Sequence, residues 1–196
     1  MYDKLNITEN HLRVLSLFTN GFDREYYIRE VGKLLKISPR TAQLILGDLE
    51  NKGILESKTK GKIRIYTLKR NNLCQMYITL VEQHKTITFL EKNLIIREVI
   101  EKINPFIKGI GVIFGSYAKG TANKDSDLDI FVVGEYSREE IKKVSKTYGI
   151  EISIKCYPLK TFEKNLANDT LLKEILKNHV VFLNSEQFTK MVLKNE

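Results

Sequence analysis

The sequence is poor in cysteine and has no long apolar run. Its two cysteines, Cys74 and Cys156, lie far apart in a chain of 196 residues. This argues against a disulfide framework and predicts free thiols in a reducing cytoplasm. No stretch approaches the roughly 20 apolar residues of a membrane-spanning helix. The first ten residues also lack the basic-then-apolar order of a secretory signal. We therefore expect a cytoplasmic protein with no membrane partner.

The three histidines also lack the sequence spacing that is typical of metal ligands. His11, His84 and His179 are scattered, so we expect structural or surface roles for them. The chain contains no internal repeat and no low-complexity segment. Its length allows one large or two small domains, each able to bury a core.

The most informative stretch joins two short apolar runs. The first run, residues 110–114, is typical of a buried strand and ends at Gly115-Ser116; Asp127-Leu128-Asp129 leads into the second. Carboxylates at positions i and i+2 of a strand point to the same face and repel each other unless a cation binds between them. Mg²⁺ suits this place because it prefers oxygen ligands and shares them with phosphates. Backbone N–H groups at the Gly-Ser turn can hold a phosphate. Together these features indicate nucleotide chemistry.

These residues resemble a known signature. Gly115-Ser116, ten intervening residues and Asp127-x-Asp129 between apolar flanks resemble the motif of the DNA polymerase β nucleotidyltransferase superfamily, in particular its minimal nucleotidyltransferases. The resemblance implies that Asp127 and Asp129 hold Mg²⁺ on a nucleoside triphosphate, with ATP the expected nucleotide. It also implies that Gly115 and Ser116 bind the phosphates. The alternative is a strand–turn–strand whose acidic residues cap a loop.

A third carboxylate completes the two-metal site in the superfamily. Residues 150–154 alternate as a strand, and Glu151 is the acidic residue available there, so the resemblance assigns it this role. Glutamate is one methylene longer than the usual aspartate, and Mg²⁺ demands near-octahedral geometry. The alternative is an exposed strand glutamate. Lys119 and Lys124 lie between the motifs and are candidates for binding phosphate; alternatively, they are simply solvated.

The first 70 residues predict a different kind of domain. Thr8 caps a helix that stops at Gly21, a second helix covers residues 27–35, and Ser38-Pro39 starts a third. In the second helix we expect Ile28, Val31, Leu34 and Leu35 to face inward. A hairpin follows, with an alternating strand over residues 63–67. Three helices and a hairpin resemble a winged helix-turn-helix domain.

The positive charge lies mostly on this hairpin. The formal net charge is +8, and residues 52–70 contain seven basic residues against one acidic residue. DNA phosphates are the natural partner of such a wing, and the third helix would reach base edges. The candidate DNA-binding residues are Arg40, Thr41, Gln43, Lys58, Lys60, Lys62 and Arg64. The alternative is a solvated lysine-rich hairpin on a domain that binds protein.

The predicted class is α+β, in three parts. Residues 1–71 form the winged helix-turn-helix domain, residues 72–93 a helical linker that breaks or bends between residues 85 and 93, and residues 94–196 the α/β nucleotidyltransferase domain. Residues 94–103 should form the helix before its first strand. The apolar face of the linker could serve a homodimer on a palindromic DNA site, or pack on its own domain.

Two functions remain open. The first is a Mg²⁺-dependent transferase that moves a nucleotide from a triphosphate to a hydroxyl acceptor, coupled to DNA binding. The acceptor could be an RNA end, a small molecule or a protein, and the resemblance to antitoxins among small members makes a partner toxin a candidate. The second is a DNA-binding transcriptional regulator whose inactive nucleotidyltransferase fold only binds nucleotide or a partner protein.

Overall fold

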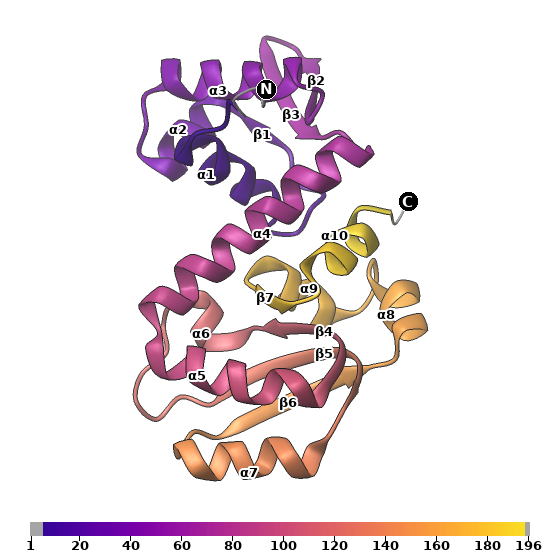
Figure 1. Ribbon diagram of the computed structural model, residues 1–196. Helices are drawn as coiled ribbons and strands as arrows, with labels where there is room; N and C mark the ends of the chain where they lie inside the picture. The colour runs from indigo at the N-terminus through magenta and orange to yellow at the C-terminus, as the bar shows by residue number, and fades with distance from the viewer. Residues whose placement is uncertain (1–5, 195–196) are drawn as a thin grey trace, which may run out of the picture. The chain divides into compact units, whose positions relative to one another are not determined.

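A computed structural model describes residues 6–194 of the chain, which divides into two compact units. The first unit comprises Met1–Val81 and the second Glu82–Glu196 (Figure 1). Both units contain helices and strands, so the predicted α+β class is confirmed. Within the described residues, no helix has the length and apolar character needed to cross a membrane.

Three helices form most of the first unit. They are α1 (Glu9–Phe18), α2 (Ile28–Leu35) and α3 (Pro39–Asn51). The predicted start of α3 is confirmed: Ser38 is the N-cap, and its hydroxyl accepts a hydrogen bond from Thr41 N–H at 3.0 Å, with Pro39 in the first helical position. The apolar residues of this helix repeat with helical period, which buries Ala42, Ile45, Leu46 and Leu49.

A small antiparallel sheet completes the first unit. Strands β1 (Tyr26–Tyr27), β3 (Ile63–Leu68) and β2 (Leu55–Lys60) pair in that order. The buried face of β3 carries Tyr66 and Leu68, which leaves Ile63 51% exposed. The inward position predicted for Leu34 in α2 is wrong, because Leu34 is 52% exposed. Periodicity placed both elements, but it did not show that some of their apolar residues face solvent.

One uninterrupted helix, α4 (Asn72–Lys92), continues the chain across the division between the units. The break expected between residues 85 and 93 falls at its end, where Asn93 precedes α5 (Leu94–Ile103). The bounds of α5 agree with the predicted helix. Both cysteines are free, Cys74 in the first unit and Cys156 in the second, as the sequence predicted.

The second unit is built on a four-stranded sheet of order β6-β5-β4-β7. Its strands are β4 (Ile107–Ile113), β5 (Leu128–Tyr136), β6 (Ile152–Tyr157) and β7 (Val180–Leu183). The β5–β6 pair is parallel, and the two other pairs are antiparallel. Strand β6 therefore forms one edge of the sheet, and β5 lies in its interior.

Helices cover both faces of this sheet (Figure 1). On one face, α5 and α7 (Arg138–Tyr148) contribute Val99, Ile103 and Ile141 to a core with Leu128 and Ile130 of β5. On the other face, the ring of Phe131 on β5 contacts that of Phe162 on α8 (Leu159–Asn165). Phe162 in turn contacts Phe188 on α10 (Ser185–Lys194). Two further helices, α6 (Gly115–Lys119) and α9 (Thr170–Lys177), complete the unit. Successive residues of β5 thus serve opposite layers.

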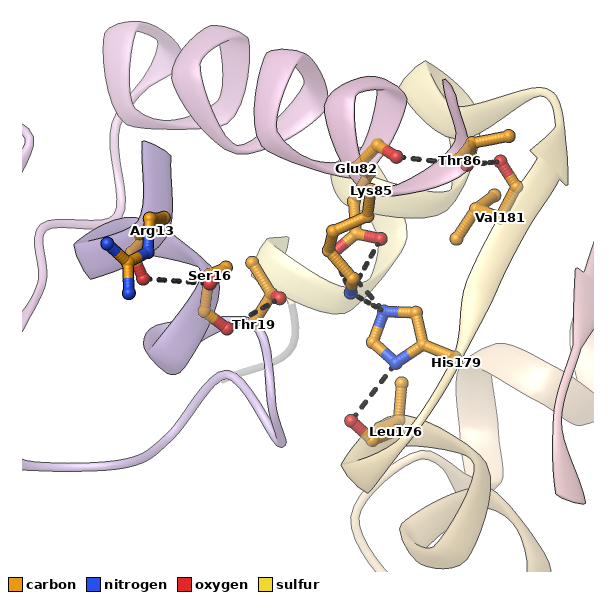
Figure 2. Close-up of polar contacts among 9 residues, drawn as sticks. All are labelled: Arg13, Ser16, Thr19, Glu82, Lys85, Thr86, Leu176, His179 and Val181. Atoms are coloured by element: carbon orange, nitrogen blue, oxygen red, sulfur yellow. Dashed lines mark hydrogen bonds and ion pairs between the residues drawn. The ribbon is translucent and has the colours of Figure 1, made fainter. Parts of the chain in front are cut away.

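A polar cluster in the second unit surrounds two buried side chains, Glu82 and His179 (Figure 2). Lys85 Nζ lies 2.9 and 3.0 Å from the two carboxylate oxygens of Glu82, and His179 Nε2 lies 3.2 Å from Glu82 Oε1. The ring nitrogen His179 Nδ1 donates to Leu176 O at 3.1 Å. Thr86 adds a bond from its hydroxyl to Val181 O at 2.9 Å. The cluster ties α4 to β7 and satisfies a carboxylate that is fully buried.

Candidate functional site

The two aspartates of the motif lie where β5 begins. Asp127 precedes the strand and is exposed, whereas Asp129 is its second residue and is half-buried. Leu128 and Ile130 are fully buried in the core on the α5 side. Because side chains alternate along a strand, Asp127 and Asp129 both lie on the opposite face. The core therefore fixes the face on which the carboxylates stand.

Gly115 allows the turn after β4 to approach one of these carboxylates. Its φ is +67°, and a Cβ atom added there would lie 2.1 Å from Asp129 Oδ2. The backbone is held by a hydrogen bond from Phe114 N–H to Asp129 O of 3.0 Å. Only glycine combines this dihedral angle with such a close contact. The first residue of the Gly-Ser motif is therefore joined sterically to the last residue of the Asp-x-Asp motif.

The surroundings of Asp129 disfavour its charged form. Burial raises the pKa of its carboxyl above the ordinary value, and repulsion from Asp127 and Glu174 raises it further, whereas Lys119 and Lys155 oppose the rise. Lys119 forms an ion pair of 3.0 Å with Glu174 on α9. A cation bound beside Asp129 would relieve this repulsion.

Glu151 lies beside Leu128, the middle residue of the Asp127-x-Asp129 motif. Leu128 N–H donates to Glu151 O at 2.8 Å, and the parallel register places Ser153, not Glu151, directly beside Asp129. Within residues 6–194, no three His, Cys, Asp or Glu side chains are grouped as metal ligands. The structure thus does not bring Glu151 together with both aspartates.

The residues present fit one Mg²⁺ better than two. Mg²⁺ usually takes one or two carboxylates and completes its shell with water and substrate phosphates. Asp127 and Asp129 share a face, and the missing Cβ of Gly115 lets the Asp129 carboxylate lie directly against the Gly-Ser turn. This donor set suits a single ion shared with a phosphate. It does not by itself supply the third carboxylate of a two-metal site.

Among the predicted phosphate-binding lysines, Lys119 lies close enough to act on Asp129, whereas Lys124 is exposed in the loop before β5. That loop is ordered by bonds from Asn123 N–H to Ser126 Oγ and from Asp125 N–H to Asn123 Oδ1, both 2.9 Å. The sequence reasoning missed Lys155 and Glu174. Strand alternation could have placed Lys155 on the aspartate face, but Glu174 is brought there by α9.

In the first unit, the structure gathers several predicted DNA-binding residues around one cavity of about 820 Å³, here called the wing cavity. It is lined by Tyr27, Ile28, Arg29, Pro39, Arg40, Gln43, Lys62, Ile63 and Arg64. The cavity lies between the beginning of α3 and the β2–β3 hairpin. Arg29 was missed by the sequence reasoning because α2 was read only for its apolar residues.

Several cations of the hairpin are already ion-paired within the unit. Lys58 and Lys60 both contact Glu25, the latter at 3.3 Å, and these contacts lower the pKa of Glu25. Arg64 Nη2 lies 2.6 Å from Glu50 Oε2. By contrast, neither Arg29 nor Lys62 has an ion-pair partner within residues 6–194.

The polar residues at the start of α3 are held locally. Arg40 Nη1 lies 3.4 Å from Gln43 Oε1, and Thr41 Oγ1 lies 2.8 Å from Ser38 Oγ. Arg40 and Gln43 are exposed, and Thr41 is half-buried. Of these three residues on α3, Arg40 and Gln43 line the wing cavity, whereas Thr41 does not.

Comparison with known proteins bears mainly on the second unit. No curated protein matches the chain. A solved structure of TrmBL2, described as an archaeal chromatin protein with a novel mode of DNA binding, is 13% identical, covers 88% of this chain and 71% of its own, and has a TM-score of 0.31. The model of the nucleotidyltransferase domain matches residues 93–194, which is more than half of the chain. The protein therefore belongs to the nucleotidyltransferase domain family.

Proposed function

We propose that the second unit is a Mg²⁺-dependent nucleotidyltransferase that transfers a nucleoside monophosphate from a triphosphate, with ATP the expected donor, to a hydroxyl acceptor. The observation that carries the proposal is the contact between Gly115 and Asp129, which joins the Gly-Ser turn to a carboxylate disfavoured in its charged form. The family match supports the reaction class.

In this proposal Asp127 and Asp129 hold the metal, and Gly115, Ser116, Lys119 and Lys124 bind the phosphates. Bound Mg²⁺ supplies charge neutralisation on the triphosphate. The acceptor hydroxyl releases its proton to solvent, and its oxygen forms a bond to the α-phosphorus as the bond to the leaving pyrophosphate breaks. Glu151 as a third ligand remains a prediction from the sequence, and no step depends on it. A protein hydroxyl, including one on a partner toxin, is a candidate acceptor.

Titration calorimetry of the full chain with ATP and Mg²⁺ tests nucleotide binding. We expect Asp127→Asn and Asp129→Asn to abolish metal-dependent binding. Asp125→Asn is the matched control, because Asp125 is an exposed acid of the same loop. Equal binding by all four proteins would contradict the proposed ligands. Mass spectrometry of incubated protein, RNA and small hydroxyl acceptors then detects transfer.

Ser153 favours a second candidate, a DNA-binding regulator that binds nucleotide without transferring it. The strand register places this serine beside Asp129, where a third carboxylate would complete a metal-binding set. Under this hypothesis, wild-type protein binds ATP but forms no adduct, and Ser153→Asp gains transfer. Adduct formation by the wild type excludes this second candidate.

We further propose that the first unit is a winged helix-turn-helix domain that binds DNA through the wing cavity. The accessible cations Arg29, Arg40 and Lys62 around one concave surface support this proposal. Fluorescence anisotropy with duplex DNA at several salt concentrations tests it. We expect Arg29→Ala and Arg40→Ala to weaken binding, and Arg24→Ala, an exposed arginine outside the cavity lining, to leave it nearly unchanged. Unchanged affinity in all three variants would contradict DNA binding at this surface.

A further inference from the structure

Strand β6 leaves one side of its backbone unpaired among residues 6–194. It is the edge of the sheet and pairs only with β5. Because Glu151 O accepts from Leu128 N–H and backbone groups alternate in direction along a strand, Ser153 directs its N–H and C=O toward β5. Ile152 and Ile154 direct theirs toward the open edge. An additional strand could therefore pair with these two residues.

A cavity of about 410 Å³, here called the β6 groove, lies along this edge. Among the residues that line it, Ile141 of α7 is buried, whereas Ile152 and Ile154 of β6 are half-buried. The remaining lining residues are Tyr136, Arg138, Lys142, Ser145, Glu151 and Ser153. The groove thus combines apolar side chains with backbone groups directed toward the open edge.

The charge on the α7 side of the groove is positive. Arg138 and Lys142 lie one helical turn apart and are both exposed. Neither forms an ion pair with another residue in the part of the chain that the structure describes. The neighbouring Lys143, which does not line the groove, is instead paired with Glu140 at 2.5 Å. The α7 rim therefore offers two cations to an acidic occupant.

We propose that the β6 groove binds an extended acidic segment of a partner protein, which adds a strand to the sheet beside β6. Main-chain hydrogen bonds to Ile152 and Ile154 fix its register, as in other cases of strand addition. Apolar side chains of the segment cover the two isoleucines, and a carboxylate contacts Arg138 and Lys142. The proposal does not depend on nucleotide transfer.

A second copy of the chain fits this edge less well. Two β6 edges that pair antiparallel about a two-fold axis normal to the sheet place both α7 helices on the same side of the joined sheet. Arg138 and Lys142 of both copies would then face one another, and like charges juxtaposed in an interface disfavour association. Lys155 points to the opposite face of β6, so it does not occupy the groove.

The test uses the full chain and a fluorescein-labelled peptide of sequence serine–aspartate–threonine–valine–threonine–valine–serine. This peptide places one aspartate and two valines on a single face when extended. We expect saturable binding that weakens about tenfold when lysine replaces the aspartate, or when Lys142→Glu reverses the charge of the rim. Lys102→Glu on α5, an exposed lysine outside the groove, is the matched control and should bind as the wild type does.

Hydrogen exchange separates strand addition from binding by side chains alone. Bound peptide should protect the amides of Ile152 and Ile154 and leave that of Ser153 unchanged, and backbone N-methylation of the peptide should abolish binding. Absence of saturable binding, equal binding of the N-methylated peptide, or self-association that Lys142→Glu strengthens would each overturn the proposal.

Discussion

Two carboxylates of the second unit experience opposite environments. Glu82 is completely buried; although burial raises its pKa, attraction to Lys85 and His179 lowers it to about 2. Asp129 is less buried, yet its pKa is raised, chiefly by burial and further by repulsion from Asp127 and Glu174, against the opposing attraction of Lys119 and Lys155. The fold thus surrounds one acid with groups that stabilise its charge. It leaves the other beside a second acid and against the Gly115 turn, as expected for a group that meets a ligand.

Replacing Glu82 should give the largest effect. Glu82→Ala removes the carboxylate that faces Lys85 and His179 in a buried site, and breaking such a pair typically costs about 3–5 kcal/mol of unfolding free energy. Urea denaturation measures this loss. Glu139→Ala, at an exposed position of α7, should stay within about 0.5 kcal/mol of wild type. A Glu82→Ala variant as stable as Glu139→Ala would show that the cluster does not hold the unit together.

The pH dependence of stability should distinguish the two carboxylates. Glu82 titrates at about 2 in the fold against an ordinary value of 4.5, so its contribution is complete above pH 4.5 and is lost as the pH falls toward 2. The shift corresponds to about 3 kcal/mol. Asp129 acts in the opposite sense: its raised pKa favours the protonated folded state, so Asp129→Asn should increase stability at neutral pH. Denaturation from pH 2 to 7 measures both effects. A wild-type profile that Glu82→Gln leaves unchanged would contradict the assignment.

The histidine of the same cluster should contribute in a different pH range. Burial lowers the pKa of His179, and Lys85 lowers it further, although Glu82 acts against the shift. A neutral ring that donates from Nδ1 to Leu176 can accept at Nε2 from Lys85 Nζ, 3.3 Å away. A lowered pKa means that this contribution is present above pH 6.5 and is lost as the pH falls below it. His179→Gln should flatten the profile near pH 6, while Glu82→Gln should act mainly below pH 4.5.

A smaller effect isolates the contact between Gly115 and Asp129. Gly115 and Gly120 have φ values of +67° and +70°, so alanine is strained at both positions, by about 1–3 kcal/mol each. Only at Gly115 does the added Cβ approach Asp129, since nothing lies within 4 Å of the corresponding atom at Gly120. We expect Gly115→Ala alone to lose ATP binding in calorimetry. Loss of binding in both variants would attribute the effect to backbone strain.

Local patterns made the motif and several element bounds predictable from sequence. Ser38-Pro39 starts α3, and the alternation around Leu128 and Ile130 gives the common face of the two aspartates. Each of these features depends on residues a few positions apart. This is why the candidate site on β5 could be proposed before its surroundings were known.

Long-range pairing was not predictable in the same way. Glu82 meets His179 from a distant part of the chain, and Glu174 is brought near Asp129 by α9. Likewise, nothing local indicated that Glu25 pairs with Lys58 and Lys60, so the charge of the hairpin was assigned to DNA as a whole. Charge counts give the net charge of a segment, but packing decides which charges have partners.

The smallest expected effects concern the same contrast between paired and unpaired charges on the hairpin. Lys62 lines the wing cavity without an ion-pair partner among the described residues, whereas Lys60 lies 3.3 Å from Glu25. If both hairpin lysines neutralised DNA phosphates, Lys60→Ala and Lys62→Ala would each reduce the salt slope of binding by about 1. We expect this only for Lys62→Ala, because Lys60 must first leave Glu25.

Glu25→Gln releases Lys58 and Lys60 and should therefore tighten binding a few-fold for all duplex sequences. Equal slopes for Lys60→Ala and Lys62→Ala, with no gain from Glu25→Gln, would show that these ion pairs do not limit the binding of DNA.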